Sequence, residues 1–536
     1  MKTNTQVVIV GGSLNGLTTA LLLATFGVRC VVIERHPETT VQYKFAGISP
    51  RSMEIYRSVG IEEEIRAKRT GDQKSGEIVR GKNLADPDLK FQGKAWAETP
   101  DLSATSAETC DQQRLEPILR AHAERLGADV RLNTELLGFE QDDDQVTARV
   151  RDLSTGEEHV ITASYLVAAD GVAGTIREKL GIERHGPGML QHWMNIIFET
   201  DLDPHLQGRS FTSCFVTDIN GTLTPREKRW LLALQYQPER GEKPEDFDQT
   251  RTAELVRKGA GRDDVKAELF DARPWEVGAY RADHFRQGRA FLVGDAAHSM
   301  PPTGGFGGNT GIHDCHNLAW KLAYVLQGKA YPKLLDTYDS ERRPVAEATL
   351  AQALARLSLW FKDEGKQLPP PVPIVDDWVV YFGHYYSSGA FIPEAEFPEH
   401  AFEDPRHPSG RPGTRAPHLT VDAACVQMPV HDCWGTDFAL LAGIEGGAWH
   451  EAAAITGIDI RCIGLAENEE LFHSAYGVDA DGAVLVRPDG FIAWRSRGAA
   501  TDAQAVLRRV LTDLSLKGQE ARADRSAAEA EAADAG

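Results

Sequence analysis

The chain has 536 residues and a mass of 58.8 kDa, which suggests three or four domains at roughly 150 residues each. Apolar residues make up 42% and charged residues 26%, as in globular proteins that bury a large core. The formal net charge of −21 argues against nucleic acid and anionic membranes as partners, because both repel an acidic surface. No apolar window is long enough to span a membrane, and the seven cysteines form no C-x-x-C pair, so we expect a cytoplasmic protein without disulfides.

The N-terminal part of the chain has the pattern of a complete βαβ unit. Residues 6–10 (QVVIV) form a β-branched run typical of a strand buried on both faces, and glycines follow at once. Leucines at helical spacing then predict a helix over 14–26, and residues 29–33 predict a second strand. Further along we expect helices at about 50–68 and 115–126, strands over 128–167, and a polar, irregular stretch over 70–108.

The pattern changes from about residue 185 onward. Residues 185–285 alternate apolar and polar side chains in short runs, which indicates an antiparallel sheet. Residues 289–294 (RAFLVG) predict another buried strand, followed by a glycine-rich loop, a helix over about 309–327 and more helix to about 362. We therefore predict an α/β fold with an α+β part, divided into a discontinuous nucleotide-binding domain (1–180 and 285–365), a sheet domain (181–284), a connecting segment (366–417), a small α/β domain (418–515) and a disordered tail (516–536).

A glycine-rich loop, Gly11-Gly12-Ser13-Leu14-Asn15-Gly16, joins the first strand to the first helix. Such a loop turns tightly, lets the backbone approach a pyrophosphate and directs the positive end of a helix dipole toward it. Glu34 ends the second strand, where a carboxylate accepts hydrogen bonds from ribose hydroxyls. Together these features predict dinucleotide binding, with a purely structural turn as the alternative.

A second glycine-rich loop follows the strand at 289–293. That strand delivers Asp295 at its carboxyl end, where ligands bind in open α/β sheets. The run Pro302-Thr303-Gly304-Gly305-Phe306-Gly307-Gly308-Asn309 then leads into the long helix. A loop with so few side chains lets backbone N–H groups approach a planar ligand, and the helix N-terminus stabilises an anion there. A merely mobile loop is the alternative.

Three motifs in this order resemble the FAD signatures of one family. They are the first glycine loop, the segment Tyr165-Leu166-Val167-Ala168-Ala169-Asp170-Gly171 with Arg177, and Gly294-Asp295 with the P-x-x-G-x-G-x-N run. Over about residues 5–350 the chain resembles the class A flavoprotein monooxygenases, typified by p-hydroxybenzoate and phenol hydroxylases. Its C-terminal part, with Leu485-Val486-Arg487-Pro488-Asp489-Gly490, resembles the thioredoxin-like domain of actinobacterial polyketide-tailoring hydroxylases.

The resemblance implies a fold and an activity. The fold is a Rossmann-like FAD-binding domain, an antiparallel substrate-binding sheet domain and a thioredoxin-like domain, which without C-x-x-C has no dithiol redox role. The activity is an FAD-dependent monooxygenation in which NADPH or NADH reduces the flavin, O2 forms a C4a-hydroperoxyflavin, and a phenolic, polyketide-type substrate of antibiotic biosynthesis is hydroxylated. Alternatives are Baeyer–Villiger or other flavin monooxygenation, a simple phenol or halophenol hydroxylase, and a non-catalytic FAD- or substrate-binding protein. A homo-oligomer also stays open.

The resemblance also assigns cofactor contacts to individual positions. The first loop holds the FAD pyrophosphate, Glu34 the adenosine ribose, and Gln112 the ribityl–phosphate portion. Pro302 and Gly305 lie at the reacting edge of the flavin and are the expected catalytic positions, without an assigned acid or base. The full set of expected cofactor contacts is Gly11, Ser13, Leu14, Asn15, Gly16, Glu34, Arg35, Lys44, Gln112, Asp170, Asp295, Pro302, Gly305, Gly307, Gly308 and Asn309.

Three positions depart from the family pattern. Ser13 replaces a glycine, Lys44 stands where relatives often have an arginine, and Phe306 stands where many have glutamine. We expect the substrate against the 190–240 sheet, under an apolar lining, and no metal site. The candidate lining residues are Trp193, Phe198, Phe211, Phe215, Trp230 and Tyr236.

Overall fold

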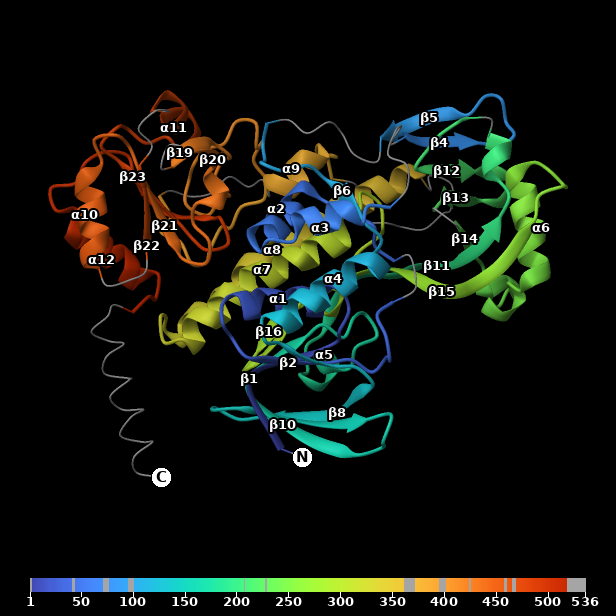
Figure 1. The fold of residues 1–536 in the computed structure, drawn as a ribbon, viewed down its shortest axis with the longest axis horizontal. Helices are drawn as coiled ribbons and strands as arrows, with labels where there is room; N and C mark the ends of the chain where they lie inside the picture. The colour runs from blue at the N-terminus through green and yellow to red at the C-terminus, as the bar shows by residue number, and fades with distance from the viewer. Residues whose placement is uncertain are drawn as a thin grey trace.

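The computed structural model describes residues 2–40, 44–70, 77–94, 101–206, 208–226, 229–360, 372–394, 402–423, 426–456, 460–464 and 469–517. Figure 1 shows the C-terminal part, in orange and red, at one end of the molecule and a green antiparallel sheet at the other. The two long helices α7 (Phe306–Leu326) and α8 (Thr337–Trp360) run through the middle. Within the described ranges, no helix has both the length and the apolarity needed to cross a bilayer.

The first sheet is centred on β1 (Lys2–Val10). This strand pairs in parallel with β2 (Cys30–Ile33) on one side and β10 (Glu158–Ala168) on the other. Being central, it is buried on both faces, which explains its β-branched sequence. The strand order is β16-β17-β10-β1-β2-β7, with β8 and β9 joined at β10. The other strands are β7 (Asp129–Arg131), β8 (Thr134–Gln141), β9 (Val146–Asp152), β16 (Arg286–Gln287) and β17 (Ala290–Leu292).

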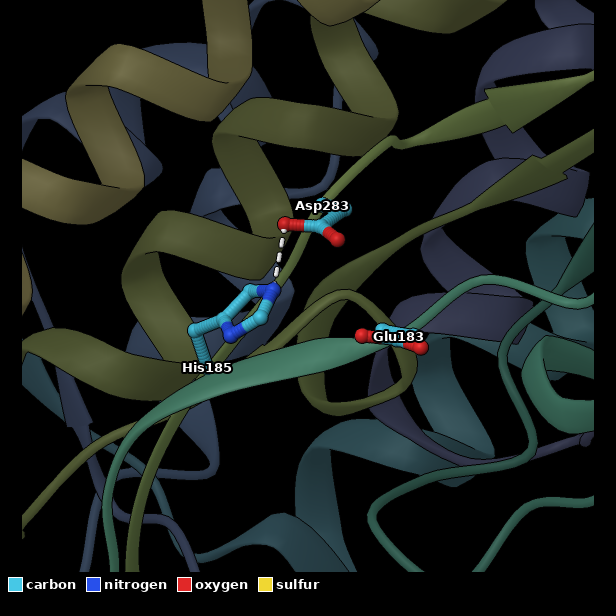
Figure 2. A group of neighbouring side chains, drawn as sticks. All are labelled: Glu183, His185 and Asp283. Atoms are coloured by element: carbon cyan, nitrogen blue, oxygen red, sulfur yellow. Dashed lines mark ion pairs between the residues drawn. The ribbon is translucent and has the colours of Figure 1, made fainter.

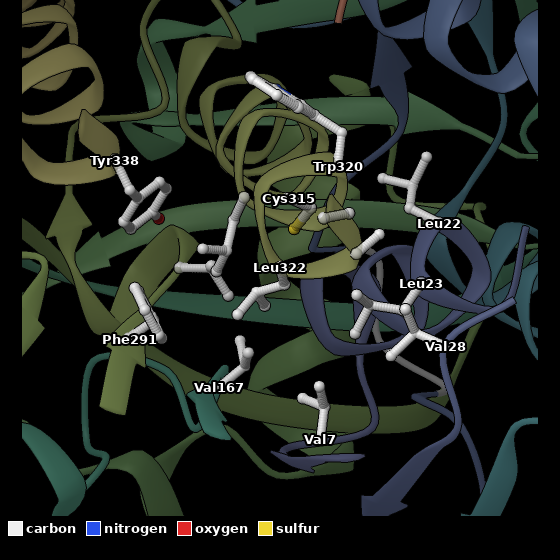
Figure 3. Packing of buried hydrophobic residues seen from close by; sticks show 14 of the residues in the cluster. Val7, Leu22, Leu23, Val28, Val167, Phe291, Cys315, Trp320, Leu322 and Tyr338 are labelled. Atoms are coloured by element: carbon white, nitrogen blue, oxygen red, sulfur yellow. The ribbon is translucent and has the colours of Figure 1, made fainter. Parts of the chain in front are cut away.

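Helices cover this sheet and close its core. The helix α1 (Leu14–Thr25) connects β1 to β2 and packs against both α7 and α4 (Gln112–Arg125). Figure 3 shows Val7 and Val167 of the sheet facing Leu23 of α1 and Leu322 of α7. The remaining elements of this part are β3 (Gly47–Ile48), α2 (Pro50–Ser58), α3 (Glu62–Ala67), β6 (Glu108–Thr109) and α5 (Ile176–Lys179).

The second sheet is mainly antiparallel, and α6 (Gln249–Ala260) packs on one of its faces. The expectation of an irregular stretch over 70–108 is wrong, because this stretch supplies β4 and β5, which extend the sheet beyond β12. The strand β5 is the edge of the sheet and β4 lies between it and β12. Both have few buried residues, so they lack the apolar pattern of a buried strand. In spatial order the strands are β18 (His298–Ser299), β15 (Ala267–Ala282), β11 (Arg184–Thr200), β14 (Trp230–Tyr236), β13 (Gly221–Pro225), β12 (Ser213–Val216), β4 (Glu77–Gly81) and β5 (Lys90–Lys94).

The C-terminal part has a small mixed sheet in the order β22-β21-β23-β24. The strand β21 is parallel to β22 and antiparallel to β23, and the βαβαββα succession is that of the expected thioredoxin-like fold. The elements are β19 (Thr420–Ala423), β20 (Val426–Pro429), β21 (Phe438–Ala442), α10 (Gly447–Ile455), β22 (Ile460–Gly464), α11 (Glu469–Tyr476), β23 (Ala483–Val486), β24 (Ile492–Ser496) and α12 (Ala503–Asp513).

Two further expectations concern the connecting segment and the tail. The described part of the connecting segment contains α9 (Asp377–Phe382), whose Trp378 and Tyr381 are buried, so it packs against the body of the protein. Leu516 is also buried and pairs with Ala330, which places the first residue of the expected tail in the ordered fold. The rest of that expectation, from residue 518 onward, lies outside the described residues.

Candidate active site

The first glycine loop is held against the carboxyl ends of β10 and β2. Gly11 has φ +105°, and a Cβ on it would lie 2.3 Å from the carbonyl oxygen of Ala169. A Cβ on Gly16 would lie 1.8 Å from the carbonyl oxygen of Gly11, so neither position accepts a side chain without movement. The Gly12 N–H donates to Glu34 Oε2 (2.7 Å), which fixes the acid beside the loop.

Ser13 points away from the loop toward α4. Its hydroxyl donates to Glu116 Oε1 (2.6 Å), and the Gln112 amide donates both to Ser13 Oγ (2.8 Å) and to Glu116 Oε1 (2.6 Å). The Thr40 N–H binds the other carboxylate oxygen at 2.9 Å. Burial raises the pKa of Glu116, against these hydrogen bonds. Glu116 is thus a central site residue that the predicted set omitted, and its fixed spacing after Gln112, one helical turn, was the available signal.

The second glycine loop meets the first at Asn15. A Cβ on Gly294 would lie 1.8 Å from Asn15 Nδ2, and a Cβ on Gly311 would lie 2.6 Å from the same atom. The Cys315 thiol donates to the Asn15 carbonyl oxygen at 3.2 Å. Two segments separated by almost 300 positions therefore meet at the Asn15 side chain. Leu14, the next residue, lies close to Gly308 of the second segment.

The stretch before α7 is shaped by left-handed glycines and held by Asn309. Gly305 has φ +66° and precedes the helix, and its N–H donates to the Pro302 carbonyl (2.9 Å). The Asn309 amide accepts from the Ser49 N–H (2.8 Å) and donates to the Gly47 and Gly305 carbonyls. The positions of Gly307 and Gly308 are closely packed: a Cβ on Gly308 would lie 2.4 Å from the Phe45 ring, and one on Gly307 would lie 3.4 Å from Met300.

Phe306, the departure from glutamine, is a buried anchor. Its ring packs edge-on against Tyr381 of α9, and the Arg356 guanidinium lies over it at 4.9 Å from the centroid. The Tyr381 hydroxyl also donates to the Gly304 carbonyl (3.1 Å). Through Tyr381, the connecting segment therefore contacts both the glycine loop and the first residue of α7.

The remaining predicted cofactor residues carry charge. Asp170 accepts from the Ile176 N–H through Oδ2 (3.2 Å), while its buried Oδ1 has no partner among the described residues, and burial raises its pKa. Asp295 reaches solvent, yet the protein packed around it raises the pKa of its carboxyl against the opposing field of Lys44. The charge of Lys44 also acts against the rise in the pKa of Glu116, after burial and the hydrogen bonds of that carboxyl. Arg35 is exposed beyond Glu34.

Four of the six predicted substrate residues lie in the core between the second sheet and α6. Because side chains alternate along a strand, β11 directs Phe198, and β14 directs Trp230 and Tyr236, into the core shared with α6. Phe211, which precedes β12, packs in the same core. There they pack with α6 residues such as Val256. The four are Phe198, Phe211, Trp230 and Tyr236.

Trp193 and Phe215 lie on the other face. Trp193 packs with Leu350 and Leu354 of α8 and with Met300, the residue beside the flavin-loop candidate Gly307. Phe215 stays outside the α6 core because its strand neighbours, Cys214 and Val216, point into that core. This face, with residues of β11, β12, β14 and β15 that alternate with the core set, is the substrate-facing candidate.

Comparisons with known proteins place the chain in a family. An "FAD binding domain" model matches residues 4–353, and an "Aromatic-ring hydroxylase, C-terminal" model matches residues 409–514. The chain belongs to the FAD-binding aromatic-ring hydroxylases. This hydroxylase is 39% identical to the aklavinone 12-hydroxylase of Streptomyces purpurascens, over 94% of its own length and 98% of the relative's. It is 38% identical to the 4-methyl-5-nitrocatechol 5-monooxygenase of a Burkholderia species, over 94% and 96%.

A solved structure agrees over nearly the whole chain. The crystal structure of a ternary complex of aklavinone-11 hydroxylase with FAD and aklavinone superposes with a TM-score of 0.87 at 36% identity, covering 95% of this hydroxylase and 99% of that chain. The predicted family, fold class and cofactor are thereby confirmed: the protein is a flavin monooxygenase that binds FAD.

The residues present fit FAD. The side-chain-free cradle of Gly11 and Gly16 spans the start of α1, and the partnerless Oδ1 of Asp170 offers an acceptor beside it. The second cradle, at Gly305 to Gly308, spans the start of α7, so the N-termini of α1 and α7 would stabilise the phosphate and flavin groups of FAD.

One group outside this site has the composition of a metal site. Figure 2 shows Glu183, His185 and Asp283 near one another, with an ion pair of 2.9 Å between His185 Nε2 and Asp283 Oδ1. All three side chains are exposed or half-exposed, and acids on a surface commonly gather without a metal. The ion pair accounts for the arrangement, so no metal role is assigned.

Proposed function

We propose that this monooxygenase hydroxylates a phenolic, polycyclic substrate of the aromatic polyketide class, with FAD, O2 and NADPH or NADH. The observation that carries the proposal is the 39% identity to an aklavinone hydroxylase over nearly the whole of both chains, together with the TM-score of 0.87 to one that holds both FAD and aklavinone. Bound reduced FAD would activate O2, from which the inserted oxygen atom comes, while the protein binds and orients the substrate and excludes water.

The proposed roles follow the geometry. The backbone of the first loop binds the pyrophosphate, Glu34 binds the adenosine ribose, and Gln112, oriented by Glu116, binds the ribityl chain. The N-terminus of α7 stabilises negative charge on the flavin pyrimidine ring. The remaining proposed contacts are Leu14, Asn15, Arg35, Lys44, Asp170, Asp295, Pro302, Gly305, Gly307, Gly308 and Asn309.

A single-ring substrate is the second candidate function. It is favoured by the 38% identity to a 4-methyl-5-nitrocatechol monooxygenase over nearly the full chain. Both candidates need a reductant of the cytoplasm, and we propose that location, which agrees with the free thiols of the described cysteines.

The test is turnover by the purified yellow protein. We expect aklavinone to stimulate NAD(P)H oxidation and to acquire one oxygen atom from 18O2, detected by mass spectrometry. Stimulation by 4-methyl-5-nitrocatechol alone would move the function to the second candidate. Flavin binding without substrate-stimulated oxidation by either compound would refute both.

A further inference from the structure

The substrate-facing side of the second sheet carries two amide side chains held by indoles. The strand β11 places Gln191, Trp193 and Asn195 on this side, and its pairing with β15 runs without a register shift from Gln191 to Ile197. Trp193 Nε1 donates to Gln191 Oε1 (3.0 Å). Trp275, directly opposite Trp193 on β15, donates from Nε1 to Asn195 Oδ1 (2.9 Å).

These contacts fix which end of each amide is free. An indole N–H only donates, so the oxygen of each amide must face its tryptophan. The NH2 group then points away with two N–H donors. Within the described part of the chain, the indole contact is the only side-chain hydrogen bond of Asn195 and likewise of Gln191.

The two amides differ in access. Gln191 is only 5% exposed, at the end of the face covered by Leu350 and Leu354 of α8. Asn195 is half-buried, two residues further along the strand from Trp193. Met300 packs against the same tryptophan cluster and lies where a Cβ on Gly307 would touch it, at 3.4 Å. Asn195 therefore lies on the same face of the sheet as Trp193 and Trp275, whose cluster Met300 joins to Gly307.

We propose, resting on the function proposed above, that Asn195 is a specificity-determining residue. Its Nδ2 donates to a carbonyl or phenolate oxygen of the polycyclic substrate, and Trp275 is a positioning residue that keeps this donor turned outward. A site built around such a donor discriminates against ligands that lack the acceptor, because the buried amide is then left unpaired.

The decisive variant is Asn195→Asp. The aspartate keeps the size and the acceptor for the Trp275 indole but replaces the donor with an anion. We expect the Kd for aklavinone, measured on the holoenzyme by the change in flavin absorbance, to rise about tenfold or more. The product formed per NAD(P)H consumed should also fall, because a misplaced substrate is hydroxylated less efficiently.

A matched pair of tryptophan variants separates positioning from stability. Trp275→Phe removes the indole donor behind Asn195, and Trp230→Phe makes the same change on the α6 side of the same sheet. We expect a severalfold rise in Kd only for Trp275→Phe. Flavin content and melting temperature, measured for each variant, identify any loss of folding.

Each outcome decides the proposal. Unchanged aklavinone Kd in both Asn195→Asp and Trp275→Phe would overturn it and leave the proposed function standing. Equal weakening by Trp275→Phe and Trp230→Phe would overturn it in favour of a structural role. If the wild-type enzyme binds 4-methyl-5-nitrocatechol but not aklavinone, or binds neither, the function proposed above fails first and the inference falls with it.

Discussion

Two buried histidines should make this enzyme sensitive to mild acid. His316 of α7 is 8% exposed and His384 of the connecting segment is 3% exposed. Burial, with the charge of Arg51 as the next cause, lowers the pKa of His316 to about 3. Burial and then Arg342 hold the pKa of His384 well below its usual range. Both imidazoles therefore stay neutral in the folded state at pH values where an unfolded histidine is protonated.

The sign and size of the effect follow from proton linkage. Below about pH 6.5 these two histidines bind protons in the unfolded chain but not in the folded chain. The free energy of unfolding therefore falls as pH decreases. At about one pH unit below 6.5, each histidine removes about 1.4 kcal/mol, or about 3 kcal/mol for the pair. That is a large share of the roughly 5–15 kcal/mol that stabilises a typical protein.

The assay is urea unfolding of the holoenzyme at pH 7.5 and pH 5.5, followed by tryptophan fluorescence. His316→Gln and His384→Gln should each reduce the pH-dependent difference by about 1.4 kcal/mol. The same change at the exposed His407 serves as the control for the substitution itself. Carboxyls with a raised pKa, such as Asp170, act in the opposite sense, and the comparison of variant with wild type cancels them. A double variant that retains the wild-type pH dependence would refute the reasoning.

Two further predictions concern the cofactor cradle and the C-terminal domain. Gly16→Ala should yield protein without flavin, because its Cβ would lie 1.8 Å from the Gly11 carbonyl oxygen. The absorbance spectrum of the purified protein measures the flavin content. The control Gly138→Ala, whose Cβ would have no atom nearer than 3.6 Å, should retain flavin. Arg487→Met should lower the free energy of unfolding by about 3–5 kcal/mol in urea, because it leaves the buried Glu341 carboxylate short of a partner; a loss below about 1 kcal/mol would contradict this.

The nucleotide-binding half was predictable because its signals are local. A β-branched strand, a glycine turn and an acid at the next strand end are consecutive in the sequence, and the structure joins Gly12 to Glu34 as that pattern requires. The second loop was equally predictable from its glycines. What the sequence did not contain was the link between the loops, because the contact of Asn15 with Gly294 depends on how α1 and α7 pack.

The substrate side was less predictable, since aromatic content says nothing about which face of a sheet a residue takes. Trp193 and Phe198 lie on one strand, yet the odd-numbered residue faces α8 and the even-numbered one faces α6. Strand geometry alone divides residues 191–198 into two alternating sets, one on each face of the sheet. Only the position of α6 shows which of the two sets lies in the core. Gln191 and Asn195, the polar residues on the face toward α8, were better indicators of the substrate side than the aromatic residues. Polar side chains on a buried strand need hydrogen-bond partners, so they point to a functional face.

The C-terminal domain is tied to the flavin-loop helix by buried charge. Arg487 binds both Glu341 of α8 and Asp489, and Lys321 of α7 binds the same glutamate at 2.8 Å, with every one of these side chains fully or almost fully buried. Such a network costs desolvation, so its net contribution to stability is small, whereas a misdocked domain would leave each charge unpaired. We infer that the network serves chiefly to fix one docking geometry. Because α7 begins at the glycine loop, that geometry also determines where the loop meets its cofactor.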